Sequence, residues 1–212
     1  MSRIYADKNK KYIIMANQKC GYTSLCEVFK NKKNIVNDFD KHWDNSILKK
    51  FVKNNNMDEY NKILIIRDPI KRICSFFKDW VLESNNDNII FIRLKKIIGN
   101  DYDLFKTNLN LNNSISFEIF CQYLKQIIDS NHTYKCHLQP QYMLYYDNNI
   151  PLFKINTILK LEKFDYEYFK TLTTYDYGHM NKSRSYNYED FLNDNSIALL
   201  KDIYKKDYEL FF

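Results

Sequence analysis

The stretch "KKYIIMANQKCGYTSLCEVFKNKK", residues 10–33, holds a strand signal, a tight loop and a helix signal in direct succession. Residues 10–16 are apolar and rich in β-branched and aromatic side chains, which predicts a short buried strand. Residues 23–33 carry apolar side chains at helical spacing and end in lysines, which predicts an amphipathic helix. A strand that passes through a tight loop into a helix is the opening of an α/β unit.

The rest of the sequence continues this alternation of strands and helices. Further strands are expected at residues 34–39, 62–69 and 157–164. Helices are expected at residues 44–54, 70–83, 89–98, 116–129 and 165–172, with one or two more over residues 188–212. Such alternation favours a mainly parallel central sheet with helices on both faces, so we expect an α/β fold in one domain, residues 1–212.

Composition limits the class of protein without naming an activity. The net charge of +6, from 32 basic and 26 acidic residues, favours anionic partners but does not choose among them. The five cysteines lack CxxC spacing and are odd in number, so we expect free thiols in a reducing compartment and no zinc site. No apolar run near residue 1 is long enough for a membrane span, and we expect a soluble, cytoplasmic protein.

The loop over residues 18–24 has the residue types of an anion site. Backbone N–H groups at a helix N-terminus attract anions, Lys19 adds a full charge, and Thr23 and Ser24 add hydroxyl donors. Gly21 would let the backbone approach a ligand closely. The loop of nucleoside triphosphatases requires G-x-x-x-x-G-K-[ST], whereas Lys19 here precedes the glycine and no Ser or Thr directly follows it. The spacing therefore argues against that class.

Two motifs together resemble the donor-binding motifs of sulfotransferases. "QKCGYTSL", residues 18–25, resembles their 5′-phosphosulfate loop, Pro-Lys-x-Gly-x-Thr-Ser, and "IIRDPIKRICSFF", residues 65–77, resembles their 3′-phosphate motif, Arg-Asp-Pro-x-x-Arg-x-x-Ser-x-Tyr. "CHLQPQYMLYYD", residues 136–147, looks like the His-x-x-Pro-Gln segment of Golgi carbohydrate sulfotransferases. Gln18 and Phe77 depart from the usual Pro and Tyr, and neither change removes a charged ligand group.

The resemblance implies a P-loop-like fold and 3′-phosphoadenosine 5′-phosphosulfate (PAPS) as the sulfuryl donor, with no metal required. Lys19 would contact the oxygen that bridges phosphate and sulfate, where negative charge develops. The expected donor-binding residues are Lys19, Cys20, Gly21, Tyr22, Thr23 and Ser24 at the 5′-phosphate, Arg67 and Ser75 at the 3′-phosphate, and Lys182, Ser183 and Arg184 in a late basic loop. Arg72 is expected to be a surface charge on the following helix.

The acceptor hydroxyl needs a base, and histidine suits this because its unperturbed pKa is ~6.5. In related sugar sulfotransferases the base lies between the two phosphate motifs, and His42 has that placement, so it is the first choice. His137 is the second choice. It would alternatively contact the acceptor, as would Gln141.

We expect the acceptor to be a carbohydrate hydroxyl, with protein tyrosine and small alcohols left open, and we expect no nucleic-acid partner. One alternative is a nucleotide-dependent phosphoryl transferase of the kinase type, which magnesium-dependent ATP turnover would support. The other is a non-catalytic basic module that binds nucleic acid or glycan, suggested by the charge and the 17% aromatic content. That module would need a continuous basic and aromatic face, whereas the aromatics here lie mostly at helix-core spacing.

Overall fold

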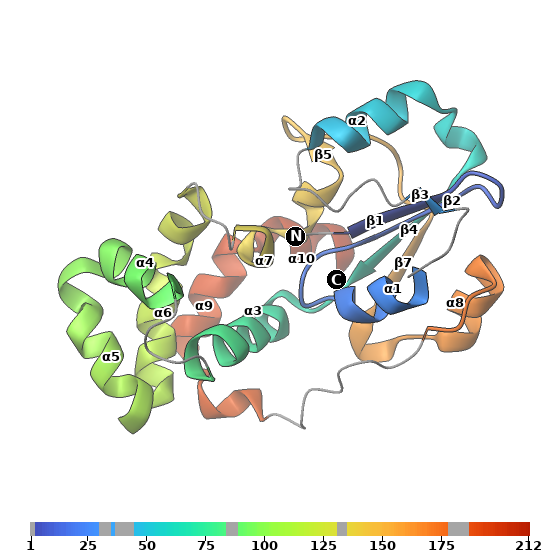
Figure 1. The fold of residues 1–212 in the computed structure, drawn as a ribbon. Coiled ribbons are helices and arrows are strands. Elements are labelled where there is room, and N and C mark those ends of the chain that lie inside the picture. The colour runs from blue at the N-terminus through green and yellow to red at the C-terminus, as the bar shows by residue number, and fades with distance from the viewer. Residues whose placement is uncertain (1–2, 30–34, 37–44, 84–88, 131–134, 178–186) are drawn as a thin grey trace. The chain divides into compact units, whose positions relative to one another are not determined.

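The computed structural model describes residues 3–29, 35–36, 45–83, 89–130, 135–177 and 187–212. The chain divides into two compact units (Figure 1). The sheet unit comprises Met1–Asp68, Gln141–Arg184 and Phe211. The helical unit comprises Pro69–Pro140, Ser185–Leu210 and Phe212.

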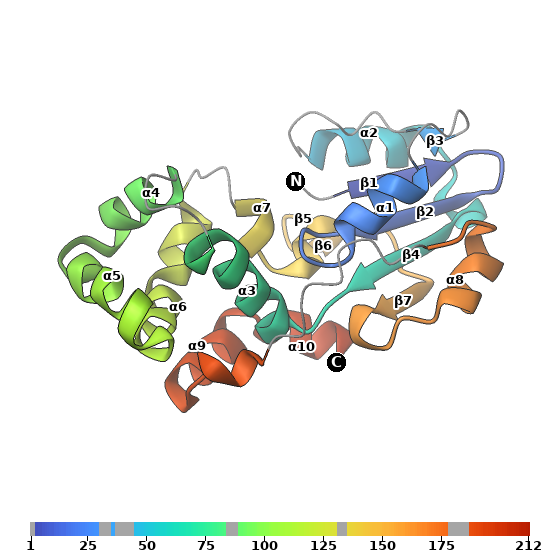
Figure 2. The ribbon, with the colours of Figure 1, turned by 60° about the horizontal axis from the view of Figure 1, so that its bottom comes forward.

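The sheet unit is built on a five-stranded sheet of order β3-β1-β2-β4-β7. Strands β2, β4 and β7 run parallel, whereas β1 pairs antiparallel with both β2 and β3 (Figure 2). A separate hairpin pairs β5 with β6. The elements of this unit are β1 (Arg3–Asp7), β2 (Tyr12–Ala16), α1 (Tyr22–Phe29), β3 (Ile35–Val36), α2 (Asn45–Asn54), β4 (Asn61–Ile66), β5 (Tyr146–Asp147), β6 (Ile150–Pro151), β7 (Thr157–Lys160) and α8 (Tyr166–Thr173), with 3-10 turns at Met57–Glu59, Gln141–Leu144 and Leu161–Lys163.

Helices cover both faces of this sheet, α2 on one face and α1 and α8 on the other (Figure 1). Ile13 of β2 belongs to the apolar cluster that contains Leu48 of α2. Its neighbour Ile14 belongs to the cluster that contains Leu25 of α1 and Phe169 of α8. Successive side chains of a strand point to opposite faces, so a strand covered on both sides must be apolar throughout. All five residues of β2 are accordingly buried.

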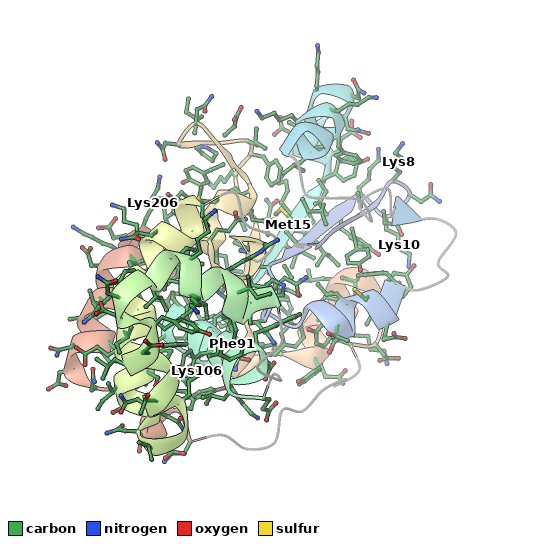
Figure 3. The ribbon with its side chains drawn as sticks, turned by 60° about the vertical axis from the view of Figure 1, so that its left-hand side comes forward. Lys8, Lys10, Met15, Phe91, Lys106 and Lys206 are labelled. Carbon is green, nitrogen blue, oxygen red and sulfur yellow. The ribbon has the colours of Figure 1, made fainter. Side chains whose placement is uncertain are left out.

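The helical unit has a core rich in aromatic side chains. The Phe77 ring lies with its centroid 4.9 Å from that of Phe117 and 5.3 Å from that of Phe120. Figure 3 shows Phe91 in this interior, where it is 3% exposed, and Lys106 on the surface. The elements of this unit are α3 (Pro69–Phe77), a π-helical turn (Lys78–Leu82), α4 (Ile89–Ile98), α5 (Tyr102–Leu111), α6 (Asn113–Asp129), α7 (Lys135–Leu138), α9 (Asp194–Ile203) and α10 (Lys205–Phe211), with 3-10 turns at Gly99–Asp101 and Tyr188–Asp190.

The expected α/β class, the mainly parallel sheet and the helices on both faces are confirmed. Strand β1 and helix α5 were not expected from the sequence. Of the strand expected at residues 34–39, only Ile35–Val36 falls within the described residues, as β3. In the described part of the chain, no helix combines the length and apolar character that a bilayer crossing requires.

Candidate active site

The loop between β2 and α1 is a tight turn in the left-handed backbone region. Cys20 N donates to the carbonyl oxygen of Asn17 over 3.1 Å, and both Lys19 (φ 64°) and Gly21 (φ 79°) have positive φ. The left-handed conformation costs a non-glycine residue about 1–2 kcal/mol, so Lys19 keeps it only because its surroundings impose it. Thr23 is exposed and Ser24 is buried in the first turn of α1.

Position 21 requires glycine for two reasons: there is no room for a side chain, and the backbone has a positive φ. The Tyr177 hydroxyl donates to the Gly21 carbonyl oxygen over 2.9 Å. A Cβ atom on Gly21 would lie 2.0 Å from that hydroxyl oxygen. Burial raises the pKa of Tyr177 above its usual range, so its hydroxyl stays neutral and able to donate at physiological pH. Tyr177 thus holds the loop from one side, and no pattern in the sequence predicts this role.

The turn after β4 contacts the Lys19 loop directly. Since β2 and β4 are parallel neighbours, their carboxyl ends lie at the same edge of the sheet (Figure 2). Arg67 Nη1 donates to the Lys19 carbonyl oxygen over 3.2 Å. Arg67 Nε lies 3.6 Å from Glu162 Oε1, and the same oxygen accepts from Asp68 N over 3.2 Å. The structure therefore brings together two of the predicted site residues, Lys19 and Arg67.

Gln141 joins these two turns through its side-chain amide. Oε1 accepts from Arg67 N over 2.9 Å, and Nε2 donates to the Arg67 carbonyl oxygen over 2.8 Å. The Cys20 thiol donates to the same Oε1 over 3.1 Å. Gln141 is 1% exposed. This position argues against the acceptor contact that the sequence suggested for Gln141.

Arg72 is fully buried in the helical unit, so the expectation of a surface charge was wrong. Its Nη1 donates to the His137 carbonyl oxygen over 2.8 Å, and its Nη2 donates to the Gln139 carbonyl oxygen over 2.7 Å. The last carbonyls of a helix have no partner within it, and α7 ends at Leu138, so a buried guanidinium can satisfy them. The charge also lies 5.4 Å from the ring centroid of Tyr204.

The remaining predicted residues lie in α1, in the helical unit or outside the described residues. Ser75 is buried in α3. The His137 ring is partly exposed and lies 5.7 Å from the Phe76 ring and 5.5 Å from the Trp80 ring, centroid to centroid. Tyr22 begins α1. The residues that fall outside the described ranges are His42, Lys182, Ser183 and Arg184.

The described site residues are suited to anion binding. The loop offers a lysine, main-chain N–H groups and hydroxyls, and the neighbouring turn adds the Arg67 guanidinium, groups that bind anions in proteins. Within the described ranges, no three His, Cys, Asp or Glu side chains lie close enough together to hold a metal ion.

Comparison with known proteins identifies the family. The model of the sulfotransferase family matches residues 5–212, which include both units and both phosphate motifs. No curated protein and no solved structure matches the chain. Because the family match covers nearly the whole sequence, the chain belongs to the sulfotransferase family, whose members are enzymes that use PAPS as donor.

Proposed function

We propose that this sulfotransferase moves the sulfuryl group of PAPS to a carbohydrate hydroxyl by in-line transfer, with a histidine as base. The observation that most strongly supports PAPS binding at this site is the 3.2 Å hydrogen bond from Arg67 to the Lys19 carbonyl, because it joins the two phosphate motifs. A carbohydrate as acceptor is supported only by the "HLQPQ" segment, residues 137–141, which resembles the His-x-x-Pro-Gln segment of Golgi carbohydrate sulfotransferases. The family match spans both units, and we propose that they form one sulfotransferase domain.

In the proposed donor complex, the 5′-phosphate lies at the N-terminus of α1. Main-chain N–H groups from Gly21 to Ser24 and the hydroxyls of Thr23 and Ser24 hold it, while the Cys20 N–H stays on the Asn17 carbonyl oxygen. A helix N-terminus has unpaired N–H groups and a partial positive charge, so this is a favourable place for a phosphate. The Lys19 ammonium contacts the oxygen that links phosphate to sulfate.

The 3′-phosphate is assigned to Arg67 and Ser75. Arg67 Nε lies at 3.6 Å from Glu162, which is longer than a tight charged hydrogen bond of about 2.7–2.9 Å. A phosphate carries more charge than a carboxylate and can accept two parallel hydrogen bonds from one edge of a guanidinium. We therefore expect the 3′-phosphate to displace Glu162 from Arg67, while Arg67 Nη1 stays on Lys19 and keeps the loop in place.

The transfer step forms one bond and breaks one bond at sulfur. The acceptor oxygen bonds to sulfur while the bond from sulfur to the bridging oxygen breaks, which releases adenosine 3′,5′-bisphosphate (PAP). The acceptor proton goes to the base, and the electron pair of the broken bond stays on the bridging oxygen. Lys19 stabilises the charge that develops there, and this lowers the barrier because the charge is larger in the transition state than in bound PAPS.

We propose His42 as the base and His137 as the second candidate. A positioned base accelerates such a step by about 10²–10⁴-fold. The late basic segment with Lys182, Ser183 and Arg184 is proposed to close over the donor. The net charge of +6 would tolerate an anionic glycan as acceptor.

A radiolabelled transfer assay tests this proposal. The chain is incubated with PAPS carrying labelled sulfate and, separately, with desulfated glycosaminoglycan, a tyrosine peptide and a simple phenol. We expect label on the glycan, a loss of about 10²–10⁴-fold in kcat for His42→Ala, and little change for the matched control His132→Ala. Label on the peptide or phenol alone would refute the carbohydrate acceptor. Unchanged turnover in His42→Ala with a loss in His137→Ala would move the base to His137.

A further inference from the structure

We infer that Gln141 is a positioning residue for sulfuryl transfer, because its side-chain amide fixes the Lys19 loop and the Arg67 turn in one geometry. This inference rests on the proposed placement of the donor at these two turns. It concerns a residue that contacts neither the transferred group nor the acceptor in the proposed mechanism.

The geometry of the amide is that of a peptide group added to the end of β4. Its oxygen accepts from Arg67 N and its nitrogen donates to the Arg67 carbonyl oxygen, over 2.9 and 2.8 Å. Two bonds of opposite direction fix both the place and the orientation of the amide, because exchanging oxygen and nitrogen would set donor against donor. The pair therefore fixes the backbone of Arg67 just beyond the last residue of β4, Ile66.

The same amide oxygen also reaches the loop. The Cys20 thiol lies 3.1 Å from Gln141 Oε1, and Asn17 Nδ2 lies 3.5 Å from the Gln141 main-chain oxygen. A single atom, Oε1, thus accepts from one residue of each donor-binding turn. Any displacement of Gln141 would shift the two turns relative to one another.

Burial makes these bonds difficult to replace with water. Gln141 is 1% exposed, and Cys20 is 0% exposed. A buried polar group that loses its partner retains the full cost of its desolvation. Without the amide, the Arg67 main chain would have to move toward other partners, and the guanidinium that holds the Lys19 carbonyl would move with it.

Small displacements matter here because Lys19 must meet the bridging oxygen in the transition state. A misplacement of about 1 Å can lower a rate by about a hundredfold. Loss of the Gln141 amide should therefore raise the KM for PAPS and lower kcat, while the KM for the acceptor stays near the wild-type value. If Gln141 bound the acceptor directly, its loss would instead raise the KM for the acceptor and leave the KM for PAPS unchanged.

The test compares Gln141→Met with Gln139→Met, a control that makes the same substitution two residues earlier. PAP affinity is measured by calorimetry, and KM is measured with PAPS and acceptor varied separately. We expect Gln141→Met to weaken PAP binding by about tenfold or more and Gln139→Met to leave it within about twofold. Unchanged PAP affinity in Gln141→Met, beside a wild-type chain that binds PAP, would overturn the inference alone. Failure of the wild-type chain to bind PAP would overturn the proposed donor site and the inference together.

Gln141→Glu provides a second variant with almost the same shape and a pH-dependent readout. An ionised carboxylate cannot donate to the Arg67 carbonyl oxygen, so PAP binding should be weak at neutral pH. A protonated carboxyl can donate to that oxygen and accept from Arg67 N, so affinity relative to wild type should recover as the pH falls. A purely structural defect would show no such recovery, and its absence in the folded variant would overturn the inference.

Discussion

The guanidinium of Arg67 donates from Nη1 to the main-chain carbonyl oxygen of Lys19 over 3.2 Å, although the two residues are 48 positions apart in the sequence. This bond joins the turn after β4 to the loop after β2. It gives Arg67 two tasks in the proposed complex, to support the loop that presents Lys19 and to bind the 3′-phosphate. The two donor motifs are therefore expected to act as one site.

Removing the Lys19 ammonium tests its role at the leaving oxygen. We expect Lys19→Met to lower kcat by about 10²–10³-fold or more, because the lost charge stabilises the transition state more than bound PAPS. PAP affinity should fall much less. The control Lys8→Met removes an exposed lysine from the hairpin between β1 and β2 (Figure 3) and should leave both quantities unchanged. A Lys19→Met enzyme with wild-type kcat would contradict the role.

Neutralising Glu162 tests whether the 3′-phosphate displaces it from Arg67. Glu162→Gln removes both a competitor for the guanidinium and a like charge near the incoming phosphate. Since a partly shielded ion pair with a separation as long as 3.6 Å is expected to contribute no more than about 1 kcal/mol, PAP binding should tighten by up to about fivefold in calorimetric titrations. The control is Glu167→Gln, at an exposed position in α8. Weaker binding in Glu162→Gln would show instead that Glu162 is needed to orient Arg67.

Adding a methyl group to Gly21 tests the packing of the loop. In Gly21→Ala the new Cβ would lie 2.0 Å from the Tyr177 hydroxyl oxygen and would occupy a backbone with φ of 79°. We expect PAP affinity to fall by about tenfold or more, since the loop must shift. Gly21→Ala with Tyr177→Phe removes the closest atom but not the backbone strain, so it should recover part of the loss. An unchanged affinity in Gly21→Ala would contradict the described loop geometry.

The stability of the fold should fall at alkaline pH because of Tyr204. Burial raises the pKa of its hydroxyl above the ordinary value of about 10. Below pH 10 both folded and unfolded chains keep this proton, so Tyr204 does not lower the free energy of unfolding there. As the pH rises above about 10, the unfolded chain releases the proton first, so the free energy of unfolding falls by up to about 1.4 kcal/mol per pH unit.

Tyr204→Phe provides the comparison for that alkaline loss. It removes the titrating hydroxyl, which donates to the Leu138 carbonyl oxygen, and should cost about 1 kcal/mol at neutral pH. Urea titrations between pH 7 and 11 should then show a shallower decline than in the wild-type chain. Equal slopes above pH 10 would show that Tyr204 does not contribute to the decline.

Patterns confined to one segment of the sequence predicted most of the fold. The helix expected over residues 89–98 is α4 at Ile89–Ile98, and the apolar runs predicted the parallel strands β2, β4 and β7. Strand β1 lacked a turn signal because no glycine follows it. Instead Lys11 adopts a positive φ of 54°, and the buried Asp7 carboxylate accepts from the N–H groups of Asn9 and Lys10.

The contacts within the site were harder to predict, because they join distant parts of the chain. Lys19 and Arg67 were found from the residue types of two motifs, which are local. Gln141 and Tyr177 form hydrogen bonds with main-chain atoms of Arg67 and Gly21. Every residue type carries these atoms, so no pattern of residue types in the sequence identifies the two contacts. Arg72 was misjudged for the same reason, since its partners are carbonyl oxygens at the end of α7.

Thermal denaturation with PAP and with AMP, at equal concentrations, tests most directly whether the Lys19 loop and the Arg67 turn form one donor site. Ligands that bind the folded state raise the Tm according to their affinity. The account predicts a larger Tm increase with PAP than with AMP in the wild-type chain, and loss of that difference in Arg67→Ala. Equal increases with PAP and AMP in the wild-type chain, or a preference for PAP that persists in Arg67→Ala, would contradict it.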